Sequence, residues 1–329
     1  MSNILQPLAN ATYDCIIAIR NMYYKLPNYV EYPISNDINY GNLWIPIGVR
    51  GRKEIHYLRI GGDCSHTYIV GQTGSGKSNL VKVILSTIIN NYPTTQLILL
   101  DYKRVELSLF KHTKNCIQFE YDEDKISKAL DDILTLVLHR YEMLDNKSLT
   151  EADYTMNNVL VVIEEISLML KKDMKVLRKI MAISRAVKVF ILFTTQRPSN
   201  ECLDNVVKSL VGNRICLKTD DIKNSILALD TEGCELLKGK GHGYIKSDGY
   251  ITEFQSYHIS DTTVKDICAI HNTDKTDLKV VENVSNTEEV QIHHKPIDDE
   301  IKTPPTIIYN NEEQKDIEII QNTDWLDKL

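Results

Sequence analysis

The sequence contains no apolar run long enough to cross a membrane. The best candidate, Cys15 to Ile19, ends at Arg20, and residues 1–10 lack the basic region of a cleavable secretion signal. Seven cysteines are present, but none form a C-x-x-C pair, and their odd number and irregular spacing support neither a disulfide framework nor a zinc site. We therefore expect a cytoplasmic protein without a membrane span, whose thiols are reduced.

The net charge of −7 is unevenly distributed along the 329 residues. Residues 273–329 contain 14 acidic and six basic residues, so the remainder of the chain is close to neutral. This acidic segment is rich in Asn, Thr, Glu, Asp and Lys and has no sustained periodicity, which predicts a largely disordered tail. A nucleic-acid-binding body is usually more basic, so the near-neutral charge counts against wide contact with DNA and leaves a narrow basic surface as the alternative.

Residues 67–78 read TYIVGQTGSGKS and match the phosphate-loop pattern G-x-x-x-x-G-K-[ST]. The apolar run from His66 to Val70 predicts a buried strand before the loop. Asn79 to Ile89 has apolar residues at helical spacing and predicts a helix after it. A strand, a glycine loop and a helix start are the setting that phosphate binding requires. A glycine turn that binds nothing is the alternative, and the length of the match disfavours it.

The residue types of this loop indicate ATP and Mg²⁺ as cofactors. Glycines let the backbone N–H groups face an anion, and the helix N-terminus adds partial positive charge. Lys77 is expected to reach the β- and γ-phosphates, and the Ser78 hydroxyl to bind Mg²⁺. The predicted nucleotide-binding residues are Gly71, Gln72, Thr73, Gly74, Ser75, Gly76, Lys77, Ser78 and Asn79.

Further segments predict an α/β fold, a P-loop NTPase with a mostly parallel sheet and helices on both faces. Apolar strands are predicted at 96–101, 158–165, 189–196 and 213–219, with helices at about 124–144, 173–186 and 202–210. Gly241 to Ser247 and Tyr250 to Gln255, joined by Asp248-Gly249, predict a terminal hairpin.

Two of these strands end in polar residues that suit catalysis. Glu164 and Glu165 follow an apolar strand, and ligands bind at this edge of such sheets. Beside a phosphate loop, one acid would complete the Mg²⁺ shell and the next would polarise the attacking water. The alternative is a pair of solvated glutamates at a strand end. Gln196 ends another strand and would sense the γ-phosphate.

These motifs, in this order, resemble those of the FtsK/SpoIIIE DNA translocases, part of the HerA/FtsK group of P-loop ATPases. The resemblance runs from about Leu43 to Ile259, about two thirds of the chain. Besides the phosphate loop, the matching segments are 99–103, 106–108, 140–143, 161–165, 184–186, 195–199 and 237–243.

The resemblance implies a RecA/FtsK-like motor domain and a role for each matching residue. Glu165 corresponds to the catalytic glutamate, and Glu164 stands where the family usually has aspartate as a magnesium ligand. Gln196 corresponds to the sensor glutamine. Arg185 corresponds to an arginine that reaches the nucleotide of a neighbouring subunit; an ion-paired surface arginine is the alternative.

The resemblance also implies a homo-oligomeric ring, expected to be a hexamer, that moves double-stranded DNA. We expect an N-terminal extension at 1–42, the motor domain at 43–260 and the acidic tail at 261–329. A compact motor of this kind resembles those of plasmids, conjugative elements and phages. Two alternatives are a type VII secretion-like ATPase that moves proteins and a nucleotide-dependent adaptor. The tail would recruit a relaxase or replication protein; a solvated tail without a partner is the alternative.

Overall fold

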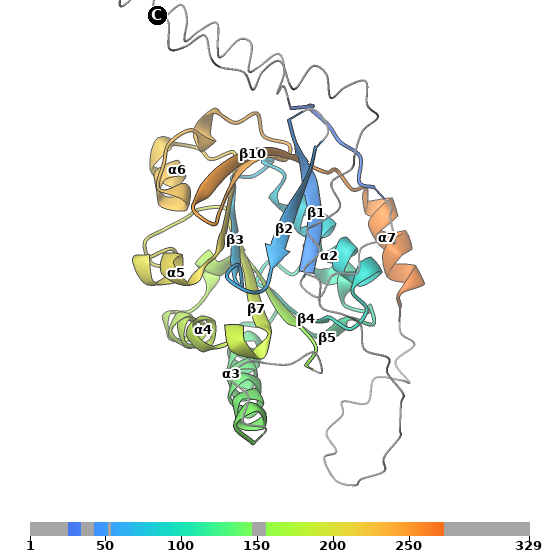
Figure 1. The fold of residues 1–329 in the computed structure, drawn as a ribbon, viewed down its shortest axis with the longest axis vertical. Helices are drawn as coiled ribbons and strands as arrows, with labels where there is room; N and C mark the ends of the chain where they lie inside the picture. Colours follow the sequence, from blue (N-terminus) through green and yellow to red (C-terminus); the bar gives the residue numbers. More distant parts are fainter. Residues whose placement is uncertain (1–25, 34–42, 52–53, 147–155, 273–329) are drawn as a thin grey trace, which may run out of the picture. The chain divides into compact units, whose positions relative to one another are not determined.

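The computed structural model describes residues 26–33, 43–51, 54–146 and 156–272. Their strands form a single sheet with the order β2-β1-β10-β9-β8-β3-β7-β6-β4-β5 (Figure 1). One half of the sheet is parallel and the other half is antiparallel. The prediction of an α/β fold with a mostly parallel sheet is therefore confirmed, with the addition of an antiparallel half.

The parallel half contains the five strands predicted from apolar runs and one more. Its strands are β3 (Thr67–Val70), β4 (Gln96–Asp101), β5 (Cys116–Glu120), β6 (Val159–Glu164), β7 (Val189–Thr195) and β8 (Asn213–Leu217). The strand β5, which was not predicted, pairs only with β4 and has four partly or fully exposed residues among its five. Such an edge strand lacks the continuous apolar run of a central parallel strand.

The antiparallel half begins with the predicted hairpin and continues into two strands that were not predicted. The hairpin strands are β9 (His242–Ser247) and β10 (Tyr250–Ser256), and the added strands are β1 (Leu43–Arg50) and β2 (Glu54–Ile60). In β1, Pro46 and Gly48 oppose a strand prediction. The pairing of β1 with β2 shifts register between these two residues, and this irregularity accommodates them.

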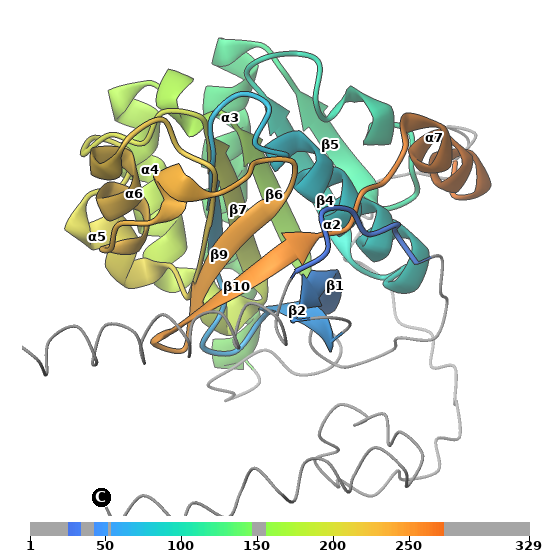
Figure 2. The same ribbon diagram turned by 90° about the horizontal axis from the view of Figure 1, so that it is seen from above.

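Helices cover both faces of the sheet (Figures 1 and 2). The helices are α2 (Lys77–Asn91), α3 (Glu123–Asn146), α4 (Lys171–Ile183), α5 (Asn205–Leu210), α6 (Ile222–Leu229) and α7 (Asp261–Ile270). Alternate residues of β6 belong to two separate cores. Leu160 and Val162 pack with α2 and α7, whereas Val159, Val161 and Ile163 pack with the other four helices. This period-two division explains why the central strands are apolar throughout.

The structure changes the expected segment boundaries. Helix α7 lies within the segment 261–329 that was expected to be largely disordered, and its Val264 and Ile267 are buried in the core beside α2. Residues 26–33, part of the expected extension, contribute Tyr32 to the same core. The acidic stretch 273–329 and its predicted partner-binding role lie outside the described residues.

Within the described ranges, no helix is both long enough and apolar enough to cross a membrane.

Candidate nucleotide-binding site

The phosphate loop joins the carboxyl end of β3 to the first turn of α2, as its sequence context predicts. Gly74 and Gly76 have φ angles of 77° and 104°, in the left-handed region that favours glycine. A Cβ atom at Gly76 would lie 2.4 Å from the amide nitrogen of Gly241. That amide donates a hydrogen bond of 2.7 Å to the Ser75 carbonyl. The glycine turn before β9 therefore supports the phosphate loop. The close approach of the Gly241 amide leaves no room for a larger residue at position 76.

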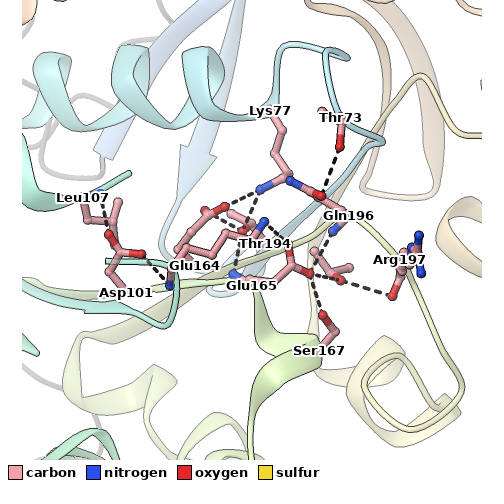
Figure 3. Close-up of polar contacts among 12 residues, drawn as sticks. Thr73, Lys77, Asp101, Leu107, Glu164, Glu165, Ser167, Thr194, Gln196 and Arg197 are labelled. Carbon is pink, nitrogen blue, oxygen red and sulfur yellow. Dashed lines mark hydrogen bonds and ion pairs between the residues drawn. The ribbon is translucent and has the colours of Figure 1, made fainter. Parts of the chain in front are cut away.

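Lys77 is buried at the centre of the site, with a side-chain exposure of 3%. Its ammonium pairs with the fully buried carboxylate of Glu164 at the end of β6. It also donates a hydrogen bond of 3.2 Å to Thr194 Oγ1 on β7, which in turn donates to Glu164 Oε2 at 2.6 Å (Figure 3). Two strands and one helix thus bring these groups together. The pairing compensates the burial of both charges.

Glu165 follows Glu164 but turns away from it into a separate network. Its Oε1 atom accepts hydrogen bonds from Ser167 Oγ at 2.6 Å, Thr195 Oγ1 at 2.9 Å and the Gln196 amide at 3.1 Å. Its Oε2 atom lies 2.6 Å from Lys103 Nζ. The two adjacent glutamates therefore have different partners, which suits different chemical roles.

The backbone and the charge state of Glu165 are both unusual. Its φ of 64° lies in the left-handed region, a conformation that is uncommon outside glycine and that clusters at functional sites. Burial would raise the pKa of its carboxyl, but the hydrogen bonds from Lys103, Ser167, the Gln196 amide and Thr195 together lower the pKa to about 2. Glu165 is therefore ionised at neutral pH.

A short loop after β4 places Lys103 beside Glu165. The buried carboxylate of Asp101 accepts the backbone amide of Lys103 at 3.1 Å through one oxygen and that of Leu107 at 3.0 Å through the other. Figure 3 shows the Asp101–Leu107 contact beside the glutamates. Because both ends of the loop are attached to one rigid carboxylate, the position of Lys103 is set by β4.

Gln196, the predicted sensor, contacts the phosphate loop directly. Its Oε1 atom accepts a hydrogen bond of 3.2 Å from Thr73 Oγ1 (Figure 3). Its backbone amide bonds to Glu165, so this residue connects the loop to the predicted base.

A cavity of about 540 Å³ opens over the phosphate loop. Seven of the nine predicted nucleotide-binding residues line it, and the exceptions are Gly71 and Ser75. The seven are Gln72, Thr73, Gly74, Gly76, Lys77, Ser78 and Asn79. Gln196 and Glu106 also line the cavity. The volume is in the range of small-ligand sites, and the first N–H groups of α2 have no intrahelical acceptor. These residues fit the triphosphate of ATP.

For Mg²⁺ the fitting groups are fewer. No cluster of three or more His, Cys, Asp or Glu side chains that would hold a metal exists among residues 26–272 as far as they are described. Ser78 lines the cavity, and Glu164 reaches Lys77 and Thr194 nearby. This donor set suits a Mg²⁺ ion that is held mainly by phosphates, with one hydroxyl and one carboxylate supplied by the protein.

Two predicted residues have additional or different contacts. Asn79 lines the cavity, but its amide also donates to the Tyr257 carbonyl at 2.6 Å and accepts from the Ile259 amide at 3.0 Å. Arg185 pairs with Asp63 at 2.5 Å. Arg185 precedes β7 and Asp63 precedes β3, so this ion pair lies at the amino ends of the parallel strands, opposite the carboxyl ends that carry the phosphate loop. Within one chain, Arg185 therefore does not contact the cavity.

Thr194, Lys103, Asp101 and Ser167 belong to this site although no sequence pattern predicted a role for them. The sequence could have indicated two of these positions. Thr194 precedes the predicted Gln196 by two residues, and residues 101–103 lie in a segment that resembles the family. No sequence signal indicated that Lys103 bonds Glu165, since 62 residues separate them.

Comparison with known proteins gives a consistent result. The model of the FtsK/SpoIIIE family matches residues 33–236, more than half of the chain. The DNA translocase FtsK of Treponema pallidum is 30% identical over 226 residues, covering 62% of this chain and 28% of its own length. FtsK of Staphylococcus epidermidis is 26% identical over 228 residues, covering 61% and 29% respectively. The chain thus spans less than a third of the length of these curated relatives.

Solved structures share the fold. The monomer form of the pCW3 conjugation coupling protein TcpA aligns with a TM-score of 0.64 at 20% identity, covering 74% of this chain and 75% of that one. The cytoplasmic domain of the Thermomonospora curvata type VII secretion ATPase EccC aligns with a TM-score of 0.63 at 18% identity, covering 74% and 32%. The resemblance noted in the sequence is confirmed: the chain belongs to the FtsK/SpoIIIE family and contains its P-loop ATPase domain.

Proposed function

We propose that this protein is a motor that couples ATP hydrolysis to movement along double-stranded DNA. The observation that supports this most strongly is the convergence of Lys77, Glu164, Glu165 and Gln196 at the phosphate-loop edge of the sheet. DNA translocases are among the relatives, and they align with 61–62% of this chain.

In this proposal each residue has a distinct task. Lys77 exchanges its Glu164 partner for phosphate oxygens and neutralises their charge. Glu165 orients and polarises the attacking water, and Gln196 relays the state of the γ-phosphate position to it. Mg²⁺, held by Ser78 and Glu164 together with the phosphates, would neutralise the charge that develops on the transferred group.

The proposed assembly is a homo-oligomeric ring, with a hexamer as its expected form, located in the cytoplasm. Because Arg185 lies opposite the phosphate loop of its own chain, it would serve the site of a neighbouring subunit. Contacts to DNA in such a ring would be made mainly to phosphates, and so would be insensitive to base sequence. The similarity to a conjugation coupling protein supports a role in the transfer or maintenance of a mobile element.

The decisive experiment is ATP turnover with and without double-stranded DNA. We expect stimulation by duplexes of unrelated sequence, with an apparent DNA affinity that falls steeply as salt rises, because phosphate contacts release counterions. The Glu165→Gln variant is the control for contaminating ATPases. Single-stranded DNA of equal length tests whether the duplex is the substrate.

Absence of stimulation at low salt would contradict the proposal. Turnover stimulated by a protein substrate instead would favour the secretion alternative, which the fold similarity to EccC raises. ATP binding without stimulated turnover by either polymer would favour the adaptor that recruits a relaxase or replication protein.

A further inference from the structure

We propose that the segment 28–30, together with His258, forms the pocket for the adenine base of the bound nucleotide. This inference rests on the proposed ATPase function. The cavity over the phosphate loop is lined by two groups of residues with different chemistry. One group is the loop, and the other is Asn28, Tyr29, Val30 and His258, none of which belongs to a phosphate-binding motif.

The segment 26–33 is attached to the domain and not loosely placed against it. The His258 amide donates to the Val30 carbonyl at 2.7 Å, and the Tyr32 amide donates to the His258 carbonyl at 3.0 Å. Leu26 and Tyr32 are buried, and Tyr32 Oη lies 3.1 Å from Thr87 Oγ1 of α2. The segment is therefore fixed to the strand end after β10 and to the helix that follows the phosphate loop.

Tyr29 and His258 present an aromatic surface to the cavity. Their ring centroids are 5.1 Å apart with an interplanar angle of 37°, and Tyr29 Oη lies 3.1 Å from His258 Nδ1. Both residues line the cavity, and Tyr29 is 57% exposed. A large exposed aromatic ring that is held by its neighbours has a free face, and stacking of a base on such a face contributes about 1–3 kcal/mol.

Asn79 links the two groups of lining residues. Its side chain bonds to the Tyr257 carbonyl and the Ile259 amide, on either side of His258. Asn79 follows Lys77 and Ser78 in the first turn of α2. The backbone on either side of His258 is thus connected by two hydrogen bonds to the helix turn that would hold the phosphates. One ligand, with phosphates at one end and a base at the other, fits this arrangement.

The test compares ATP with inorganic tripolyphosphate, which lacks the base. For Tyr29→Ala, we expect ATP binding to weaken about 5- to 150-fold, the range for loss of one base–aromatic stack. Tripolyphosphate binding should remain at the wild-type level, because the phosphate loop is unchanged. Tyr29→Phe should retain ATP affinity, since the ring remains. Isothermal titration calorimetry of each ligand measures both affinities in the full chain.

Tyr250→Ala is the matched control, because Tyr250 is 78% exposed and lies outside this cavity. Thermal unfolding of the variants verifies that they fold. Wild-type ATP affinity in Tyr29→Ala, or an equal loss of tripolyphosphate binding, would overturn the base pocket while leaving the phosphate site intact. Failure of the wild-type protein to bind either ligand would instead overturn the proposed ATPase function and the base pocket with it.

Discussion

Lys103 Nζ lies 2.6 Å from Glu165 Oε2, and this ion pair joins two motifs that are 62 residues apart in the sequence. The other carboxylate oxygen of Glu165 accepts three further hydrogen bonds. A carboxylate with all these donors is a weak proton acceptor. Lys103 thus covers the oxygen of Glu165 that has the fewest other partners.

Removal of the Lys103–Glu165 ion pair should increase the rate of ATP hydrolysis in the absence of DNA. For Lys103→Met we expect ATP turnover without DNA to rise by about tenfold, because a charge-assisted hydrogen bond to the base is lost. The KM for ATP should be unchanged. Steady-state phosphate release measures both, and Lys111→Met, at an exposed position, is the control. A fall in turnover would instead show that Lys103 orients Glu165 productively.

The phosphate lysine and the proposed base should separate binding from hydrolysis. Lys77→Ala should abolish ATP binding, and Glu165→Gln should bind ATP but hydrolyse it about 10²- to 10⁴-fold more slowly. Since Lys77→Ala leaves the buried Glu164 carboxylate unpaired, it should also destabilise the fold by about 3–5 kcal/mol. The double variant Lys77→Met/Glu164→Gln removes both charges and controls for that loss. Normal turnover by Glu165→Gln would exclude Glu165 as the base.

Arg185 should act between subunits if the ring model is right. Arg185→Ala should bind ATP normally and hydrolyse it poorly, and mixing it with Glu165→Gln should restore some turnover, because one class of interface keeps both groups. Asp63→Asn removes only the partner of Arg185 in an exposed ion pair, which contributes about 0–1 kcal/mol, and should leave turnover unchanged. If the mixture shows no restored turnover, and if Arg185→Ala and Asp63→Asn lower turnover equally, the only role of Arg185 is the ion pair with Asp63.

A buried histidine should make the fold sensitive to acid. His66 accepts the Ile191 amide at 3.0 Å and lies 2.9 Å from the Met181 carbonyl, so it is neutral. Burial lowers its pKa to about 4 from 6.5, against the opposing effect of the Met181 carbonyl. The unfolded chain therefore binds a proton between these values that the folded chain does not, and stability present above pH 6.5 is lost as pH falls toward 4.

From pH 6.5 to 5, this residue should remove about 2 kcal/mol from the free energy of unfolding. Denaturant unfolding across that interval should show a shallower pH slope for His66→Gln than for the wild type. Some slope should remain in the variant, since burial also lowers the pKa of His56 to about 4. Parallel slopes for the two proteins would contradict the assignment.

Local sequence determined the elements whose signals are contained in a short stretch. The phosphate loop, the central apolar strands, the 248–249 turn and the positions of Glu164, Glu165 and Gln196 at strand ends were all predicted. Each depends on a spacing of a few residues. The edge strand β5 and the strands β1 and β2 were not predicted, because partial exposure or proline and glycine weaken their patterns.

Only the tertiary structure decided which of these elements meet. In the folded chain, Lys77 pairs with Glu164, and Lys103 pairs with Glu165. Residues 26–33 bond to the segment that follows β10, and Arg185 lies at the strand ends opposite the phosphate loop. The physical reason is that hydrogen bonds and ion pairs act over about 3 Å in space, whereas sequence patterns report only neighbours along the chain. Strand order, which brings distant segments to one edge, is set by the packing of the whole core.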